Sequence, residues 1–439
     1  MKELHKFDDD DRWMRREILF CLFFFVLPPT SSLFSACALL LFWFLPHLSI
    51  IRCGNLFLTQ WYWRLRQGEK TLLMRFTTKL LPSRSGRLGV LQLNHPKALH
   101  ALTLDMVYCM QDVLEEWYKT DSLKAILIKS SEAKRPAFCA GGDVKTVYER
   151  GLSKSNPQEF FYEEYKVNHA IATSPIPIIS LWDGVVMGGG VGISIHGKYR
   201  VATENTLFAM PETAIGLFPD VGSMFWMNRL LTRPVANYLA LAGKRIDAAD
   251  LIHTGLATHY VPSNQLKNLE TALAEATDKA ADDSDTFVES VLMSFHETID
   301  TGSSFLAVNQ KIIERSFDAR SVEEVFDNLA RDSSDFGQKT LDNLRKLSPT
   351  SLKVTFEGLE RGSVIGTIGE DLHMEFRMAS ACMRPGADFY EGVRAVLVDK
   401  DHSPKWSPST LQEVSEEMVE AFFAPVVAEW QIPQSASKL

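Results

Sequence analysis

Two glycine-rich segments constrain the fold of this 439-residue chain more than any other feature. Residues 138–143 (FCAGGD) and 187–192 (MGGGVG) each follow a predicted strand and precede a predicted helix. Glycine lets the backbone approach a ligand closely, and a helix that begins there directs N–H groups and its dipole at an anion. The repeated unit predicts a layered α/β core. Taken alone, the first segment is explained equally well as an ordinary strand-to-helix turn.

Hydrophobic patterning places the other elements. We expect strands at residues 72–76, 88–93, 125–129 and 176–181, a strand pair over 200–209, and a turn at 82–86. We expect helices over 104–117, 246–256, 266–280 and 322–329, where apolar residues recur at helical spacing. These elements divide the chain into an apolar N-terminal extension (1–68), a core (69–302) and a mainly helical C-terminal region (303–439).

Charge and cysteine usage exclude several classes of protein. The net charge is -9 and basic residues form only short clusters, so we expect no nucleic-acid partner. The six cysteines are scattered without Cys-x-x-Cys or His pairing, which predicts reduced thiols and no metal site. No nucleophile-elbow sequence is present, so a Ser/His/Asp triad is not expected.

Three carboxylates are candidates for chemistry. Glu212 and Asp220 lie in the mostly apolar stretch 208–222, and Glu164 lies on a predicted helix with an aromatic face. Apolar surroundings raise a carboxyl pKa and suit the group to acid–base or nucleophilic roles. Structural explanations remain open: Glu212 could cap the next turn, Asp220 could cap the helix near Met224, and Glu164 could be a solvated helix charge.

The chain resembles the enoyl-CoA hydratase (crotonase) superfamily. The resemblance is carried by residues 94–99 (NHPKAL), 138–143, the triple glycine 188–190 and 255–257 (GLA). It implies a crotonase-like spiral of repeated β-β-α units that binds acyl-CoA, followed by the helical C-terminal region. It also implies that the backbone N–H groups of Gly142 and Gly189 hold the thioester oxygen. No cofactor is expected, since CoA arrives as part of the substrate.

Within that superfamily, the sequence is similar to the 3-hydroxyisobutyryl-CoA hydrolases at residues 210–220 (MPETAIGLFPD), 389–401 and 404–406. The similarity implies that Glu212 acts on water or attacks the thioester directly, while Asp220 and Glu164 orient the 3-hydroxyl end. It further implies that Ala140 contacts substrate and that Lys145 meets a CoA phosphate. Together these features predict an acyl-CoA thioester hydrolase that acts in valine breakdown.

One departure and two alternatives accompany this resemblance. Hydratases carry a glutamate two residues after the triple glycine, whereas this chain has Gly192, which disfavours hydration. A non-catalytic relative, such as a component of the mitochondrial ribosomal small subunit, is one alternative. Another acyl-CoA enzyme of the superfamily is the second. The resemblance also makes a homo-oligomer an expectation.

The two ends of the chain indicate different locations. The terminal Ser437-Lys438-Leu439 matches the peroxisomal signal, so we expect an import receptor as partner and a peroxisomal location, with mitochondria as the alternative. Residues 18–27 and 33–51 are apolar, and the second stretch is about as long as a membrane span. Two interpretations stay open: an extension attached to a soluble enzyme, or a membrane anchor at residues 33–51.

Overall fold

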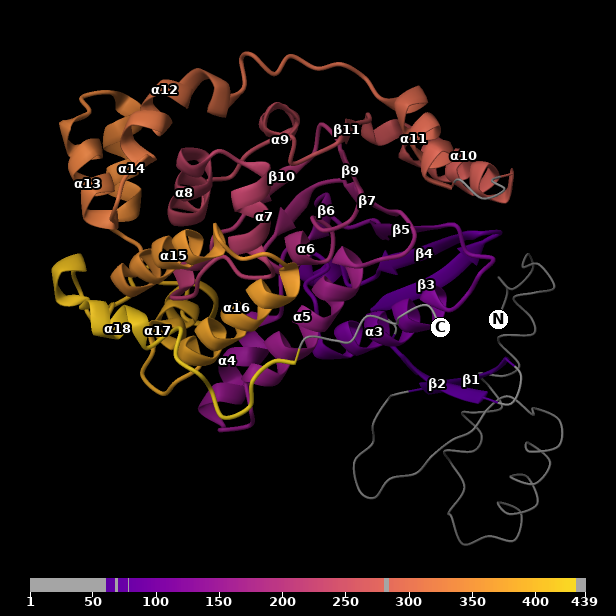
Figure 1. Cartoon of the computed structure of the whole chain (residues 1–439), viewed down its shortest axis with the longest axis horizontal. Helices are drawn as coiled ribbons and strands as arrows, with labels where there is room; N and C mark the ends of the chain where they lie inside the picture. Colours follow the sequence, from indigo (N-terminus) through magenta and orange to yellow (C-terminus); the bar gives the residue numbers. More distant parts are fainter. Residues whose placement is uncertain (1–60, 68–69, 78, 280–283, 432–439) are drawn as a thin grey trace, which may run out of the picture. The chain divides into compact units, whose positions relative to one another are not determined.

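The computed structural model describes residues 61–67, 70–77, 79–279 and 284–431 (Figure 1). Its contacts divide the chain into two units, residues 1–76 and 77–439. In the first unit, β1 (Trp61–Gln67) pairs antiparallel with β2 (Lys70–Phe76). The apolar stretches near the N-terminus and the terminal Ser-Lys-Leu lie outside the described residues. Within the described ranges, no helix is long and apolar enough to cross a membrane.

The second unit contains a six-stranded sheet. Its strands, in spatial order, are β11 (His259–Tyr260), β9 (Tyr199–Ala202), β7 (Ile178–Trp182), β5 (Ala125–Ser130), β4 (Leu88–Leu93) and β3 (Leu80–Ser85). All neighbours are parallel except β3 and β4. The turn predicted at 82–86 is wrong, because most of it belongs to β3. Pro82 is tolerated there because β3 is an edge strand, where a missing N–H costs no ladder hydrogen bond.

Two helices cover one face of this sheet. Alternate residues of β4, β5, β7 and β9 point to that face, where they pack against α10 (Leu266–Lys279) and α11 (Ser284–Phe295). Leu269 and Leu273 of α10 and Val288 and Leu292 of α11 are fully buried in this cluster. The sheet is therefore held from one side by helices whose apolar residues recur three or four positions apart.

A second, three-stranded sheet positions the glycine-rich loops. Its order is β10 (Leu207–Ala209), β8 (Val185–Met187) and β6 (Ala137–Cys139), and both pairings are parallel. The carboxyl ends of parallel strands meet at one edge, so the segments that follow all three strands come together. The strand pair expected over 200–209 is not a pair, because β9 and β10 belong to different sheets.

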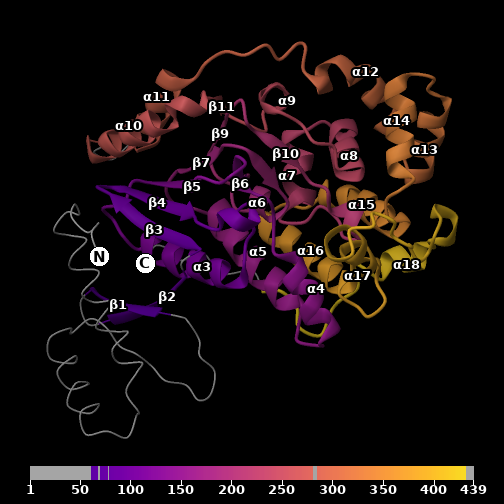
Figure 2. The same ribbon diagram turned by 180° about the vertical axis from the view of Figure 1, so that it is seen from behind.

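Helices surround these sheets. Besides α10 and α11, those before the C-terminal region are α3 (Leu104–Tyr118), α4 (Val144–Leu152), α5 (Gln158–Ala172), α6 (Gly189–Gly192), α7 (Ser223–Leu230), α8 (Arg233–Ala242) and α9 (Ala248–Thr254). The later ones are α12 (Phe305–Phe317), α13 (Val322–Arg331), α14 (Asp335–Leu344), α15 (Pro349–Gly362), α16 (Ile368–Cys382), α17 (Asp388–Val393) and α18 (Glu416–Glu420). Helix α16 packs on α5 and α7, and α17 packs on α4 (Figure 2). The mainly helical C-terminal region is confirmed.

Backbone contact between α17 and the short helix η2 (Glu212–Ile215) fixes the start of the candidate site. A β-carbon at Gly216, whose φ is +70°, would lie 2.2 Å from the backbone of Asp388. A β-carbon at Gly392 would lie 2.3 Å from the backbone of Ile215. Because each glycine faces main chain rather than a movable side chain, neither position has room for a larger residue.

We expect Gly392→Ala to lower the free energy of unfolding by about 1–3 kcal/mol, because the new methyl group must push η2 away from α17. Denaturant unfolding measures this change. Gly302→Ala is the control, since a β-carbon there meets only Asp300 Oδ1 at 3.5 Å. Equal stability of the two variants would contradict the packing described.

Candidate active site

Two backbone N–H groups lie next to each other at the edge of the three-stranded sheet. Gly142 follows β6, and Gly189 begins the short helix that follows β8. A β-carbon at Gly189 would lie 3.1 Å from the Gly142 nitrogen, so the two segments are in close contact. Within the described residues, neither amide donates to another protein group. The neighbouring backbone is bound to Leu102, since Gly141 O accepts from the Leu102 N–H and the Asp143 N–H donates to Leu102 O, both at 2.8 Å. Two free, adjacent donors form the arrangement that stabilises an oxyanion.

Glu164 and Glu212 lie against this same glycine turn. A β-carbon at Gly189 would lie 2.3 Å from Glu164 Oε1, and one at Gly188 would lie 2.7 Å from Glu212 Oε1. Both side chains are buried, with exposed fractions of 2% and 6%. Glu164 Oε1 and Glu212 Oε2 have no hydrogen-bond partner among the described residues. Buried acceptors without partners are costly, so these oxygens are suited to a polar ligand or water.

Asp220 is the third buried carboxyl group. It has an exposed fraction of 4%, and its Oδ2 accepts a hydrogen bond of 3.0 Å from the Tyr165 hydroxyl. Tyr165 follows Glu164 on α5, so this helix supplies both the Glu164 carboxyl group and the hydroxyl group that binds Asp220. Electrostatic repulsion from Asp220 acts on both Glu164 and Glu212. The three carboxyl groups thus form one cluster, although they come from three separate segments.

Burial is the main cause of the unusual acidity of this cluster. It raises the pKa of Asp220 to about 7, although the Tyr165 hydrogen bond opposes the rise. Burial, followed by repulsion from Asp220 and Glu212, raises the pKa of Glu164 well above its ordinary value. Burial and repulsion from Asp220 do the same for the pKa of Glu212. Since three adjacent buried charges are costly, the raised pKa values suit the cluster to proton exchange.

Gly192, two residues after the triple glycine, has no room for a side chain. A β-carbon at Gly192 would lie 2.6 Å from Val221 Cβ and 2.9 Å from Asn168 Nδ2. Val221 itself has φ +58°, which is strained for a β-branched residue. No glutamate fits at Gly192 while Val221 holds this conformation. The absence of a second hydratase acid therefore has a packing cause.

The structure places the sequence-predicted residues as follows. It brings Gly142, Gly189, Glu164, Glu212 and Asp220 together. The interpretation of Glu164 as a solvated helix charge is wrong, because the side chain is buried. The helix-capping alternative for Asp220 is also wrong, since the N-cap residue of α7 is Gly222 and the Asp220 side chain accepts no hydrogen bond from the first turn of that helix.

The two remaining predicted residues lie at the periphery. Ala140 is half-buried at the end of β6, where its N–H donates to Leu99 O at 3.0 Å. Lys145 is exposed on the first turn of α4. Their predicted contacts with CoA remain predictions.

Sequence patterns did not single out four further residues near this cluster. Tyr165 binds Asp220, and Asn168 is fully buried one turn later on α5 with both amide atoms unpaired among the described residues. Asp371 and Glu375 of α16 are fully buried and bind the start of α7. The sequence could have indicated that Asp371 and Glu375 are buried. Leu372, Phe376 and Ala379 recur at helical spacing and place the two acids on an apolar helix face.

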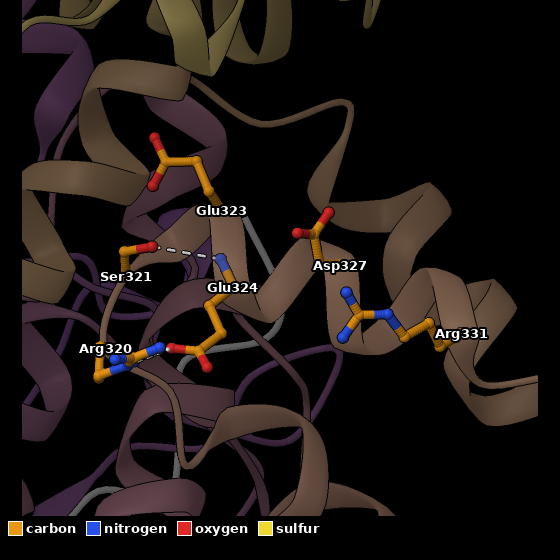
Figure 3. Close-up of a pocket in the computed structure, with 6 residues that line it drawn as sticks. All are labelled: Arg320, Ser321, Glu323, Glu324, Asp327 and Arg331. Atoms are coloured by element: carbon orange, nitrogen blue, oxygen red, sulfur yellow. Dashed lines mark hydrogen bonds and ion pairs between the residues drawn. The ribbon is translucent and has the colours of Figure 1, made fainter.

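A surface hollow of about 580 Å³ lies elsewhere, at the start of α13 (Figure 3). Its lining residues are Arg320, Ser321, Glu323, Glu324, Asp327 and Arg331. Ser321 caps α13 by accepting from the Glu324 N–H at 3.2 Å, and Arg320 pairs with Glu324 at 3.2 Å. These contacts explain Ser321 as a helix cap and Arg320 and Glu324 as a surface ion pair. The carboxyl cluster remains the candidate active site.

Known proteins with related sequences include several thioester hydrolases. The chain is 45% identical to the mitochondrial 3-hydroxyisobutyryl-CoA hydrolase of Danio rerio, over 79% of this chain and 90% of the relative. It is 44% identical to the protein of the same name from Homo sapiens, over 77% and 86% of the two chains. These relatives are named as mitochondrial, so the predicted peroxisomal location is wrong.

Solved structures and a family model agree with this relationship. A carnitinyl-CoA dehydratase from Mycobacterium thermoresistibile superposes with a TM-score of 0.74 at 33% identity, covering 82% of this chain and all of that one. An enoyl-CoA hydratase from Rhodobacter sphaeroides gives 0.71 at 34% identity, covering 80% and 98%. The enoyl-CoA hydratase/isomerase family model matches residues 88–423. The crotonase-like fold is confirmed, and the chain belongs to the enoyl-CoA hydratase/isomerase family.

Proposed function

We propose that this protein hydrolyses the thioester of 3-hydroxyisobutyryl-CoA to 3-hydroxyisobutyrate and free CoA, a step of valine breakdown. The observation that carries the proposal is the buried carboxyl cluster beside two free backbone N–H groups. The hydrolase names of relatives at 44–45% identity identify the substrate. Chemistry and sequence thus lead to the same activity.

The proposed reaction uses the Gly142 and Gly189 amides as an oxyanion hole. The thioester carbonyl oxygen accepts from both N–H groups, which stabilise the negative charge that develops when the carbonyl carbon is attacked. One such donor contributes about 3–4 kcal/mol of transition-state stabilisation in other hydrolases. Because both amides belong to segments held by the three-stranded sheet, little reorganisation is needed.

Glu212 is the group that starts the reaction. Its ionised carboxyl either removes a proton from the attacking water or attacks the carbonyl carbon itself. Water attack gives a tetrahedral oxyanion that carries the new hydroxyl group, whereas carboxylate attack gives one bonded to Glu212. Collapse of either species breaks the C–S bond. In the water route, Glu212 returns its proton to the departing sulfur, which leaves as CoA thiol. In the carboxylate route, collapse leaves a mixed anhydride between Glu212 and the acyl group, and water then hydrolyses it and supplies the proton of the thiol. Water supplies the oxygen of the acid product in the overall reaction, so no cofactor is required.

Asp220 and Glu164 recognise the 3-hydroxyl end of the acyl group. Both are buried beside Glu212, and Glu164 Oε1 has no partner among the described residues. A hydroxyl group satisfies such an acceptor, whereas a substrate that lacks it leaves the acceptor buried and unpaired. Hydration of a double bond is not supported by this site, since the position of the second hydratase acid is closed at Gly192.

The location and the oligomeric state of the protein are also part of the proposal. The names of the relatives favour mitochondria. A homo-oligomer remains a prediction from the family resemblance, and light scattering of the purified chain tests it. The alternative of a purely structural protein is not favoured, because the three acids are present, buried and close together.

Replacing Glu212 by Gln should lower kcat for 3-hydroxyisobutyryl-CoA by about 100–10,000-fold, since the amide keeps the shape but cannot act as a base. Thiol release measures the rate, with acetyl-CoA, crotonyl-CoA and isobutyryl-CoA as comparison substrates. Glu204→Gln, which alters an exposed carboxylate bound to Ser263, is the control and should leave kcat unchanged. A folded wild-type protein that releases no thiol would refute the proposal.

The pH dependence of kcat should reveal the mutual repulsion of the acids. Activity that needs ionised Glu212 rises with pH, and its raised pKa places this rise above the range of an ordinary carboxyl group. Asp220→Asn removes a neighbouring negative charge that raises the pKa of Glu212, so this pKa falls and the rising limb moves to lower pH. Profiles of both proteins test this. A limb that stays in place or moves to higher pH would contradict the coupling.

A further inference from the structure

The helix that follows Asp220 lacks a cap from its own sequence. Gly222 is the N-cap residue of α7 and has φ +83°, a conformation that glycine adopts without strain. It has no side chain to accept the N–H groups of the first turn. These donors need partners from elsewhere, because they are buried within the protein.

Glu375 of α16 supplies those partners. Its Oε2 accepts the Gly222 N–H at 2.7 Å, and its Oε1 accepts the Met224 N–H at 3.1 Å. Asp371, one turn earlier on α16, accepts the Phe225 N–H at 3.1 Å. Both acids are fully buried, so α16 caps α7 across about 150 residues of sequence separation.

The segment between Asp220 and α7 is held from other sides as well. Nε2 of His196 donates to Val221 O at 2.8 Å, and the Ser223 hydroxyl donates to Asp220 O at 2.5 Å. Between these contacts, Val221 keeps its strained φ of +58°. Such strain persists only when surrounding contacts over-determine the conformation.

We propose that Glu375 is a positioning residue for Asp220: its two hydrogen bonds hold the turn 220–222 so that the Asp220 carboxyl stays in the cluster with Glu164 and Glu212. Glu375 acts through Gly222, two residues from Asp220, and does not touch substrate. The proposal rests on the proposed function, because Asp220 is assigned to the acyl site. It gives the C-terminal helical region a part in positioning an acid of the site.

Several titratable or charged groups face this turn from the elements packed around it. They are Glu164 and Tyr165 of α5, His196 after α6, Glu212 of η2, Arg229 of α7, and Asp371 and Cys382 of α16. A change at Glu375 can alter the protonation of any of them. The test therefore uses a double-mutant cycle with Asp220 rather than a pH profile alone.

The experiment compares kcat per folded full-length enzyme for wild type, Glu375→Gln, Asp220→Asn and the double variant, using 3-hydroxyisobutyryl-CoA. We expect Glu375→Gln to lower kcat by about tenfold or more, because small displacements of reacting groups cost large rate factors. KM should change by less than kcat, since Glu375 binds Gly222 and Met224 and not the Gly142 and Gly189 segments proposed to hold the thioester. In the Asp220→Asn background, the same change should alter kcat by less than about twofold.

Asp371→Asn is the matched control. It also replaces a buried acid of α16 by its amide and lies beside Glu375. Its backbone hydrogen bond goes to Phe225, beyond the turn 220–222, so kcat should change by less than about threefold. Glu375→Asp is the second variant should Glu375→Gln not fold. Its carboxyl group is one methylene further from the turn, and the same loss of kcat is expected.

Two results would overturn the inference. One is an equal loss of kcat from Glu375→Gln in the wild-type and Asp220→Asn backgrounds. The other is a loss of kcat from Asp371→Asn as large as the loss from Glu375→Gln. A wild-type protein without thioesterase activity would overturn the proposed function instead. Hydrogen exchange of residues 221–224 then decides the role of Glu375: we expect faster exchange in Glu375→Gln, and unchanged exchange would overturn it.

Discussion

Burial of Glu164, Glu212 and Asp220 against one another is the constraint on which the rest of the structure depends. Each carboxyl group raises the energy of the ionised forms of its neighbours, and burial removes the water that would screen them. A cluster of this kind persists only where surrounding elements fix each segment. Burial and, after it, this repulsion raise the pKa values of the three groups, which suits them to the proton transfers that hydrolysis of a thioester requires.

Parallel strand pairing and close contacts at glycines hold the segments that carry these acids. The three-stranded sheet ends with Gly142, Gly189 and Glu212 at one edge, so separate parts of the sequence reach one place. Helix α17 presses on η2 through main-chain contacts at Gly216 and Gly392. Helix α16 caps the segment after Asp220. The C-terminal helices therefore belong to the same compact unit as the glycine-rich loops, and they shape the site.

The sequence predicted the local elements of the fold better than their pairing. Hydrophobic patterning located β4 and β5 closely, and it located the helices α3 and α10. It did not show that 200–209 divides between two sheets, because pairing depends on residues far away in the chain. It also misassigned the segment 82–86, since Pro82 indicates a turn unless the strand is known to be at an edge.

The candidate site shows the same division. Glycine-rich loops and acids in an apolar stretch pointed to Gly142, Gly189, Glu212 and Asp220 from local sequence and resemblance. Burial of Glu164 could not be predicted, because a helix with aromatic residues does not reveal which face is covered. Nor does any local pattern connect Glu375 with Gly222, which lies 153 positions away. Long-range packing decides both.

Infrared spectroscopy of the carboxyl groups tests the central claim most directly. A protonated carboxylic acid has a C=O stretching band distinct from the bands of a carboxylate. We expect such a band at neutral pH in the wild-type protein, with lower intensity in the Glu164→Gln and Asp220→Asn variants. A spectrum at neutral pH without any protonated carboxyl band would mean that the three acids are all ionised, and burial and repulsion would then not raise their pKa values.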